Sequence, residues 1–547
     1  MVPVAENKKR PITPPPENEQ PQKKIRPHRK RNKTKKYKHK RIDPTSPFGV
    51  LEFEIKELCE EHNLNLDEIS NDMKGVLNKP AIQESYHRQV ENVTILCFTS
   101  NGESLALVPH IDESKKKQVV VVPFGIPGDE VTIKIFKTHP LFAEADLLSI
   151  QTPSKLRDNS LIKCRYFGKC SGCQFQDISY DEQLKIKRMT IVNAFKHFAP
   201  KLTELKKLPD VLETQGSPLQ YNYRTKLTPH FDIATKKTGA DLEHRPNFGF
   251  GAKGRPTWRK SDFGPTGSIL DIEECDIGTQ IVNMGLRNER KRLETTYKSY
   301  EKGATILLRE DTKVKDEAFK LGEASRDEND QVSSITIEEE DHQTVVKTCV
   351  TESRQVVQEI INEFKFEFSA GEFFQNNNSI LPLVTNYVKS NLLQSKPSYL
   401  VDAYCGSGLF SITCSENVSK VIGVEVSADS VKFARHNAEL NNTENAQFIV
   451  GKAEEIFKDI DTPADQTSVI LDPPRKGCDD VFLNQLSAYN PAKIVYISCN
   501  VHSQARDVEW FLNHTENGSK YQVESIKGFD FFPQTHHVES VAVLSLR

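Results

Sequence analysis

The chain has 547 residues, of which 37% are hydrophobic and 27% are charged. This length exceeds one ordinary domain core, so we expect about three domains. The sequence has no run of about 18 apolar residues, which argues against a membrane-spanning helix. Eleven cysteines in so long a chain, with no apolar signal segment ahead of them, predict an intracellular protein with reduced thiols.

The N-terminal segment is strongly basic. Residues 1–41 contain 15 Lys or Arg and three Glu, a charge of +12, whereas the whole chain carries −3. This composition predicts a disordered basic arm over residues 1–50. The arm could be a solubilising tail, or it could attract RNA phosphates and direct the protein to the nucleus. We expect a nuclear or cytoplasmic location; acidic residues in the arm disfavour a mitochondrial presequence without excluding it.

Residues 51–85 and 86–153 have different patterns. In the first range, apolar positions at helical spacing predict a short helical segment of unknown purpose. In the second, β-branched runs separated by turn residues predict a small OB-like β-barrel of about five strands. The predicted strands include Val93–Phe98, Leu105–Val108, Val119–Val122 and Val131–Phe136. Such barrels often bind oligonucleotides, although a fold alone does not establish function.

Residues 154–365 form a predicted mixed α+β central domain. An acidic stretch over about residues 309–341 is predicted to be a solvated insertion. Cys164, Cys170 and Cys173 lie close together in the sequence, and Cys275 follows 102 residues after the last of them. Four thiols in this pattern suit a tetrahedral zinc site or a four-thiolate iron-sulfur cluster, and spacing alone does not choose between them.

Residues 366–547 alternate short apolar runs with amphipathic ones. The apolar runs are Tyr399–Asp402, Val421–Val426, Ser468–Leu471 and Lys493–Ser498. Runs of this length are typical of buried parallel strands joined by helices. We therefore expect a doubly wound, Rossmann-like α/β domain that binds its ligand at the carboxyl ends of the strands.

A glycine-rich turn follows the first of these strands. Gly406 and Gly408 would let the backbone approach a ligand closely. Glu425 lies at the tip of the next strand, where a carboxylate can accept hydrogen bonds from a ribose diol. The third glycine of the dinucleotide fingerprint is missing, which favours S-adenosylmethionine over a dinucleotide. Upstream, the amide of Gln375 is free to hydrogen-bond a ligand.

Two further motifs and a C-terminal loop carry reactive side chains. Asp472 precedes a Pro-Pro pair that forces an abrupt exit from the sheet. Cys499 ends a buried strand, so we expect its thiol to face the ligand crevice. Near the C-terminus, an aromatic loop with polar interruptions leads to Glu539.

Together these motifs resemble those of the tRNA (uracil-5-)-methyltransferase family, including its rRNA-modifying relatives. The resemblance covers roughly residues 86–547, with the domains in the same order as in that family. Uracil C5 is a poor nucleophile, so a thiolate must first add to C6 and a base must later remove the C5 proton. The resemblance implies that Cys499 is this nucleophile and Glu539 this base.

The family resemblance also implies the ligands. Contacts to S-adenosylmethionine would come from Gln375, Tyr404, Glu425 and Asp472, and the barrel would be of the TRAM type. The rRNA branch of the family carries a [4Fe-4S] cluster on a similar cysteine pattern. We therefore expect such a structural cluster at the four cysteines named above, with zinc or an empty site as alternatives.

The expected substrate is RNA, with the target base extruded into the pocket. The resemblance points to the T-loop uridine at position 54 of tRNA, and an rRNA uridine is the alternative. A non-catalytic RNA-binding protein or chaperone would require neither Cys499 nor Glu539. A DNA amino-methyltransferase would favour an aromatic residue where this chain has Arg475. The sequence does not fix the oligomeric state, although we expect a monomer.

Overall fold

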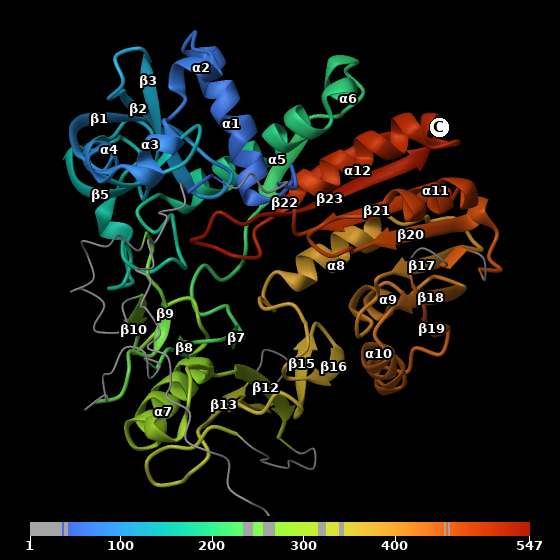
Figure 1. The fold of residues 1–547 in the computed structure, drawn as a ribbon. Helices are drawn as coiled ribbons and strands as arrows, with labels where there is room; N and C mark the ends of the chain where they lie inside the picture. The colour runs from blue at the N-terminus through green and yellow to red at the C-terminus, as the bar shows by residue number, and fades with distance from the viewer. Residues whose placement is uncertain are drawn as a thin grey trace, which may run out of the picture.

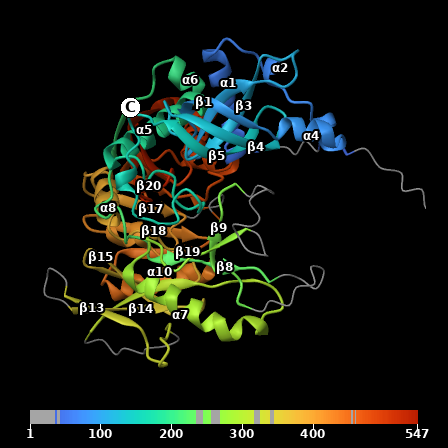
Figure 2. The same cartoon turned by 90° about the vertical axis from the view of Figure 1, so that its left-hand side faces the viewer.

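The chain folds into an N-terminal barrel with preceding helices, a central α+β part and a C-terminal α/β sheet (Figure 1). Figures 1 and 2 both place the barrel above the central part, with the C-terminal sheet beside the two. Most of the predicted arm lies outside the described residues. The computed structural model describes residues 35–37, 42–233, 244–254, 268–315, 324–338, 344–452, 456–457 and 460–547.

Short helices precede the barrel. They are α1 (Pro47–Glu61), α2 (Leu66–Ile69), α3 (Met73–Asn78) and α4 (Pro80–Tyr86). Helix α1 begins inside the span 1–50 predicted to be a disordered arm, so that boundary is wrong by a few residues. The helix starts there because the Ser46 hydroxyl accepts the Gly49 N–H and proline suits a first helical position.

The next strands form a closed barrel. They are β1 (Gln89–Phe98), β2 (Glu103–Pro109), β3 (Lys117–Pro123), β4 (Glu130–Thr138) and β5 (Ala143–Thr152). The order β1-β2-β3-β5-β4 confirms the predicted barrel, whose interior is filled by branched side chains such as Val120 and Ile133. At Gly102, in the β1–β2 turn, an added Cβ would lie 2.6 Å from the Cβ of His536. The barrel therefore lies directly against the C-terminal loop.

The central part is built around helix α7 (Gln280–Thr296) and two small sheets. Its other elements are η1 (Asn159–Leu161), β7 (Lys226–Leu227), β8 (His230–Phe231), β9 (Gly249–Gly251), β10 (Ile269–Asp271), η3 (Tyr297–Ser299), β11 (Ala304–Thr305), β12 (Leu308–Val314), β13 (Ser334–Glu338) and β14 (Thr344–Val350). The sheets have the orders β10-β9-β8-β11 and β13-β14-β12-β7. Ile281, Leu286 and Leu293 of α7 pack against both.

The acidic stretch is not solvated where it begins, which corrects the predicted insertion at 309–341. Arg309 and Glu310 lie in β12 and are almost completely buried. Burial is tolerated because each charge has partners. The Arg309 guanidinium donates to Asn376 Oδ1 at 2.9 Å and lies 4.7 Å from the Phe368 ring centre. Lys347 Nζ donates to Glu310 at 2.8 Å.

The C-terminal sheet contains eight strands within the described residues, in the order β19-β18-β17-β20-β21-β23-β22-β6. Their bounds are β17 (Tyr399–Ala403), β18 (Lys420–Glu425), β19 (Ala446–Val450), β20 (Thr467–Leu471), β21 (Lys493–Ser498), β22 (Tyr521–Phe529), β23 (Glu539–Leu546) and β6 (Val211–Gln215). The strands from β19 to β21 are parallel, and β23 is antiparallel to β21. The β15 (Val356–Ile361) and β16 (Phe364–Ser369) hairpin precedes them.

Helices cover both faces of this sheet, which confirms the doubly wound fold. They are α8 (Leu381–Ser390), α9 (Leu409–Thr413), α10 (Ala428–Leu440), η5 (Ala464–Gln466), α11 (Asp480–Tyr489), α12 (Val501–His514) and η6 (Gly518–Lys520). One core joins α11 and α12 to Val401 of β17, and the other joins α8, α9 and α10 to the adjacent Leu400. Successive strand residues thus point into opposite cores.

Part of the predicted central domain belongs to the C-terminal sheet. Helix α5 (Tyr180–Phe198) is followed by α6 (Pro200–Glu204) and by the edge strand β6, which pairs in parallel with β22. Ile191 and Phe195 of α5 are buried in the same core as Val508 of α12. The predicted boundary at residue 366 therefore does not separate these segments.

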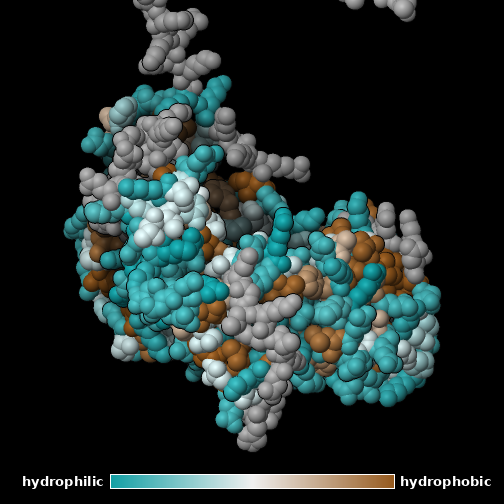
Figure 3. Space-filling model, turned by 90° about the horizontal axis from the view of Figure 1, so that it is seen from below, coloured by the Kyte–Doolittle hydropathy of each residue, from teal (hydrophilic) through white to brown (hydrophobic). Residues whose placement is uncertain are grey.

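The face seen from below is mostly hydrophilic, with hydrophobic residues in small groups, and it is hollowed near its centre (Figure 3). Among the helices that the structure describes, none is long and apolar enough to cross a membrane. The compartment and the monomeric state stay predictions.

Candidate active site

Cys499 and Glu539 lie opposite each other at one edge of the C-terminal sheet. Cys499 directly follows β21, and Glu539 is the first residue of β23. These strands run antiparallel, and Ser498 pairs with Ser540 at this end of the ladder. One step further along the register, Cys499 faces Glu539.

The two side chains share an electrostatic environment with Asp472 and Arg475. Burial, together with the carboxylates of Glu539 and Asp472, raises the pKa of the Cys499 thiol to about 12. Burial and the charge of Asp472 raise the pKa of Glu539 to about 8. The Arg475 guanidinium opposes both shifts. Arg475 is therefore the positive charge that favours the thiolate form of Cys499.

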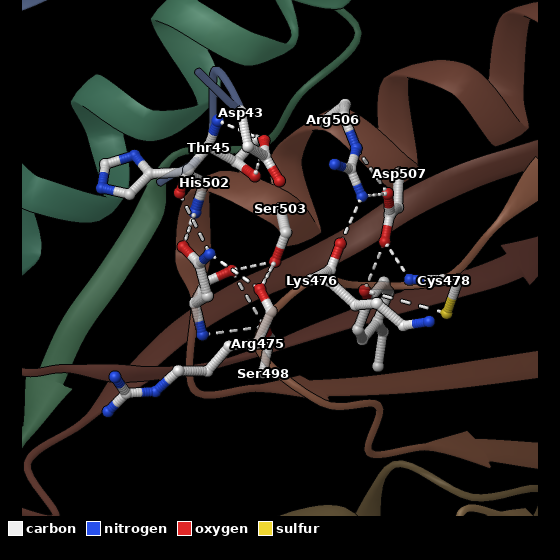
Figure 4. A network of polar contacts seen from close by, with 12 residues as sticks. Asp43, Thr45, Arg475, Lys476, Cys478, Ser498, His502, Ser503, Arg506 and Asp507 are labelled. Atoms are coloured by element: carbon white, nitrogen blue, oxygen red, sulfur yellow. Dashed lines mark hydrogen bonds and ion pairs between the residues drawn. The ribbon is translucent and has the colours of Figure 1, made fainter. Parts of the chain in front are cut away.

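The loop after β20 is held against the start of α12 by a network of polar contacts (Figure 4). Asn500 Nδ2 and Ser503 Oγ donate to the Arg475 carbonyl at 2.8 and 3.1 Å. Gly477 has a φ of 78°, and an added Cβ would lie 2.3 Å from Asp507 Oδ2, so this turn requires glycine. Asn500 was not among the predicted site residues, because in the sequence it resembles an ordinary cap of α12.

The loop that leads to Glu539 rests on a buried ion pair. Lys187 Nζ, from α5, donates to Asp530 Oδ1 at 2.5 Å and to the Phe532 carbonyl at 3.1 Å. Both charged side chains are completely buried. Gln534 has a left-handed φ of 71°, and the side chain of Gln183 accepts its N–H and donates to its side chain. Helix α5 thus fixes the position of the predicted base.

Glu425 and Asp472 lie at the carboxyl ends of β18 and β20. Glu425 accepts the Gly406 N–H at 3.3 Å and the Ser427 N–H at 2.9 Å. Burial, together with the charge of Asp402, raises the pKa of Asp472 to about 7. An added Cβ at Gly406 would meet no atom within 4 Å, so the turn leaves open space beside Glu425.

The other two predicted cofactor residues are Tyr404 and Gln375. Tyr404 has a φ of 69°, a left-handed conformation that is uncommon for residues other than glycine. Gln375 is buried, and the nearby Asn377 donates to the Phe531 carbonyl at 3.0 Å. The Gln375 segment is therefore tied to the loop that carries the predicted base.

The four cysteines of the predicted metal site lie within electrostatic range of one another. Cys275 contributes to the raised pKa values of Cys164 and Cys173, and Cys170 contributes to that of Cys275. Burial is the main reason that the pKa of Cys275 rises to about 11. Among the described residues, however, no group of three or more His, Cys, Asp or Glu side chains could hold a metal ion. These cysteines as arranged do not fit a zinc or iron-sulfur site, and the predicted [4Fe-4S] cluster is not supported.

Comparison with known proteins places this chain in a family. Residues 304–547 match the family model described as tRNA (Uracil-5-)-methyltransferase, and residues 84–148, which cover most of the barrel, match that of the TRAM domain. A crystal structure of a Pyrococcus abyssi tRNA (uracil-54, C5)-methyltransferase shares the fold, with a TM-score of 0.54 and 21% identity. The match covers 83% of this chain and 100% of that one.

Two curated relatives are more similar in sequence. The tRNA (uracil(54)-C(5))-methyltransferase of Saccharomyces cerevisiae is 56% identical over 534 residues, covering 94% of this chain and 83% of that protein. Its Schizosaccharomyces pombe counterpart is 42% identical over 484 residues, covering 87% and 82%. The chain therefore belongs to the tRNA (uracil-5-)-methyltransferase family.

Proposed function

We propose that this protein transfers a methyl group from S-adenosylmethionine to C5 of uridine 54 in tRNA, through a covalent bond between Cys499 and C6 of the base. The observation that carries the proposal is the β21–β23 register, which sets Cys499 opposite Glu539. A nucleophile and a base facing each other suit a reaction at the adjacent ring atoms C6 and C5.

The reaction assigns one role to each residue. Cys499 loses its proton to solvent, and Arg475 stabilises the thiolate. The thiolate bonds to C6, and the electron pair of the C5–C6 double bond moves onto the C4 carbonyl as an enolate. The enolate carbon C5 takes the methyl group as the bond from methyl to sulfur breaks. The Glu539 carboxylate then removes the C5 proton, and the released electron pair re-forms the double bond and expels Cys499.

The site has features that fit S-adenosylmethionine, which would supply a methyl group on a positively charged sulfur. Each carboxylate oxygen of Glu425 accepts one hydrogen bond from the described backbone and keeps a lone pair for a ribose hydroxyl. The open space at Gly406 lets a ligand approach the backbone. A buried carboxyl such as Asp472, with its raised pKa, is stabilised in its charged form by a nearby cation.

Support for tRNA as the substrate comes from the relatives, because the two yeast proteins are tRNA (uracil(54)-C(5))-methyltransferases. The small barrel beside the site suits an RNA substrate, since barrels of this class often bind oligonucleotides. A base within folded RNA must be extruded to reach a thiol at the sheet edge.

The test is methyl transfer from labelled S-adenosylmethionine to unmodified tRNA and rRNA transcripts, with the product mapped to single nucleotides. We expect 5-methyluridine at position 54 of tRNA, its loss in Cys499→Ala, and its retention in the matched control Cys97→Ala, which alters a partly buried cysteine of the barrel. A Glu539→Gln variant should accumulate a protein–RNA adduct on denaturing gels, because proton removal precedes release. Product in rRNA alone would change the substrate, and transfer that survives Cys499→Ala would refute the mechanism.

A further inference from the structure

A cavity of about 290 Å³ opens beside Cys499, and part of its wall comes from the segment that precedes and begins α1. The residues that line it from this segment are Asp43, Thr45, Ser46, Pro47 and Val50. Ser100 and Asn101, in the β1–β2 turn of the barrel, also line it. The end of the span 1–50, which the sequence predicts to be a disordered arm, thus reaches the active site.

The cavity and the predicted cofactor site have different lining residues. Cys499 lines it, whereas Glu539 and the four predicted cofactor residues do not. Arg475 and Lys476 contribute two positive charges to its lining, and Asp43 contributes one negative charge. The space therefore extends from the nucleophile toward the barrel and the N-terminal segment.

We propose that this cavity binds the ribose-phosphate backbone of RNA next to the target uridine, with residues 43–50 as one wall of the binding site. The inference rests on the proposed function, since it assumes that the base attacked by Cys499 belongs to an RNA chain. Once that base lies between the thiol and the cofactor, its ribose and phosphates must occupy space on another side of Cys499.

The groups in the cavity suit a phosphodiester and its sugar. Arg475 and Lys476 provide positive charge, and Asn101 provides an amide. His502 is about nine-tenths buried, and its Nδ1 has no hydrogen-bond partner among the described residues. A buried ring nitrogen of this kind costs free energy unless a ligand or water satisfies it.

The N-terminal wall is held in place by contacts with both neighbouring parts. Asn500 Nδ2 donates to the Thr45 carbonyl at 3.2 Å, and Figure 4 shows Thr45 above the Arg475 loop. Asn101 Nδ2, in the barrel, donates to the Pro47 carbonyl at 2.8 Å. A wall fixed in this way can contact RNA without a large cost of ordering. Asn500, which also holds the Arg475 loop, links this wall to the catalytic residues.

The test places a negative charge on the wall without disturbing the helix. Pro47 is exposed at the first position of α1, where an acidic side chain is favourable for the helix. Pro47→Glu should weaken binding of an unmodified tRNA transcript about fivefold at low salt, because a unit charge would lie near a phosphate. Pro47→Lys should strengthen binding. Ala81→Glu is the matched control, since Ala81 is exposed in the first turn of α4 and does not line the cavity.

Affinity is measured by fluorescence anisotropy on the full-length protein at two salt concentrations, and the Pro47 effects should shrink at high salt. Equal affinities for Pro47→Glu and Ala81→Glu, whether weakened or not, would overturn the inference. Methyl transfer by the unaltered protein is measured separately. Absence of transfer would refute the proposed function, while the affinity comparison would still decide whether this wall contacts RNA.

Discussion

Replacing Lys187 by methionine should destabilise the loop that carries Glu539. Lys187 Nζ is fully buried, 2.5 Å from the equally buried Asp530 carboxylate. In Lys187→Met, the carboxylate would keep the Phe532 N–H at 3.1 Å but would have no neutralising charge. Breaking one side of a buried pair costs about 3–5 kcal/mol. That is a large fraction of the roughly 5–15 kcal/mol that stabilises a domain.

A double variant serves as the control for this assay. Asp530→Asn combined with Lys187→Met removes both charges and preserves the acceptor for the Phe532 N–H, so we expect the double variant to recover most of the loss. Stability is followed by the urea midpoint, and opening of the loop by hydrogen exchange. A loss below about 1 kcal/mol in the single variant, or an equal loss in the double variant, would refute the reasoning that an uncompensated buried charge is responsible.

Three further predictions concern the reactive residues. Glu539→Gln removes a carboxylate that raises the pKa of Cys499, so iodoacetamide should label Cys499 faster above pH 8; equal labelling rates would contradict the electrostatic link. Glu539 must be ionised to accept a proton, and its pKa is about 8, so kcat/KM for tRNA should rise from pH 6 to 8.5. A flat pH profile would argue against Glu539 as the base. Asn500→Ala removes hydrogen bonds to the Arg475 and Thr45 carbonyls, so the free energy of unfolding should fall by about 1–2 kcal/mol. The single-turnover rate should also fall, and an unchanged rate would show that Asn500 does not position the loop.

Much of the C-terminal fold could be predicted because its strands are buried on both faces. Such strands appear as short apolar runs, and the run Lys493–Ser498 coincides with β21. The edge strand β6 could not be found in this way. Its partner β22 lies about 300 residues further along the chain, and pairing at that distance leaves no local pattern.

The candidate site also has one part that could be predicted from the sequence and one part that could not. Cys499 and Glu539 follow motifs that a single sequence displays, and the register of β21 with β23 then explains why they face each other. The wall at residues 43–50 carries no such motif, because its contact with Asn500 spans 455 residues. Buried charges were missed for a related reason: the partner that neutralises Glu310 is 37 residues away in the sequence.

The electrostatics of the site give a physical reason for a cationic cofactor. Four carboxyl groups, Glu425, Asp402, Asp472 and Glu539, lie at or near strand ends along one edge of the sheet. Burial is the main reason that the pKa values of the last three are raised, and each is raised further by the carboxylate named before it. Arg475 lowers the pKa of Glu539, and its single positive charge cannot neutralise four carboxylates. A ligand with a sulfonium and an ammonium group would stabilise the ionised forms. In the proposed reaction, the cofactor that supplies the methyl group would thereby also lower the pKa of the base that completes the transfer.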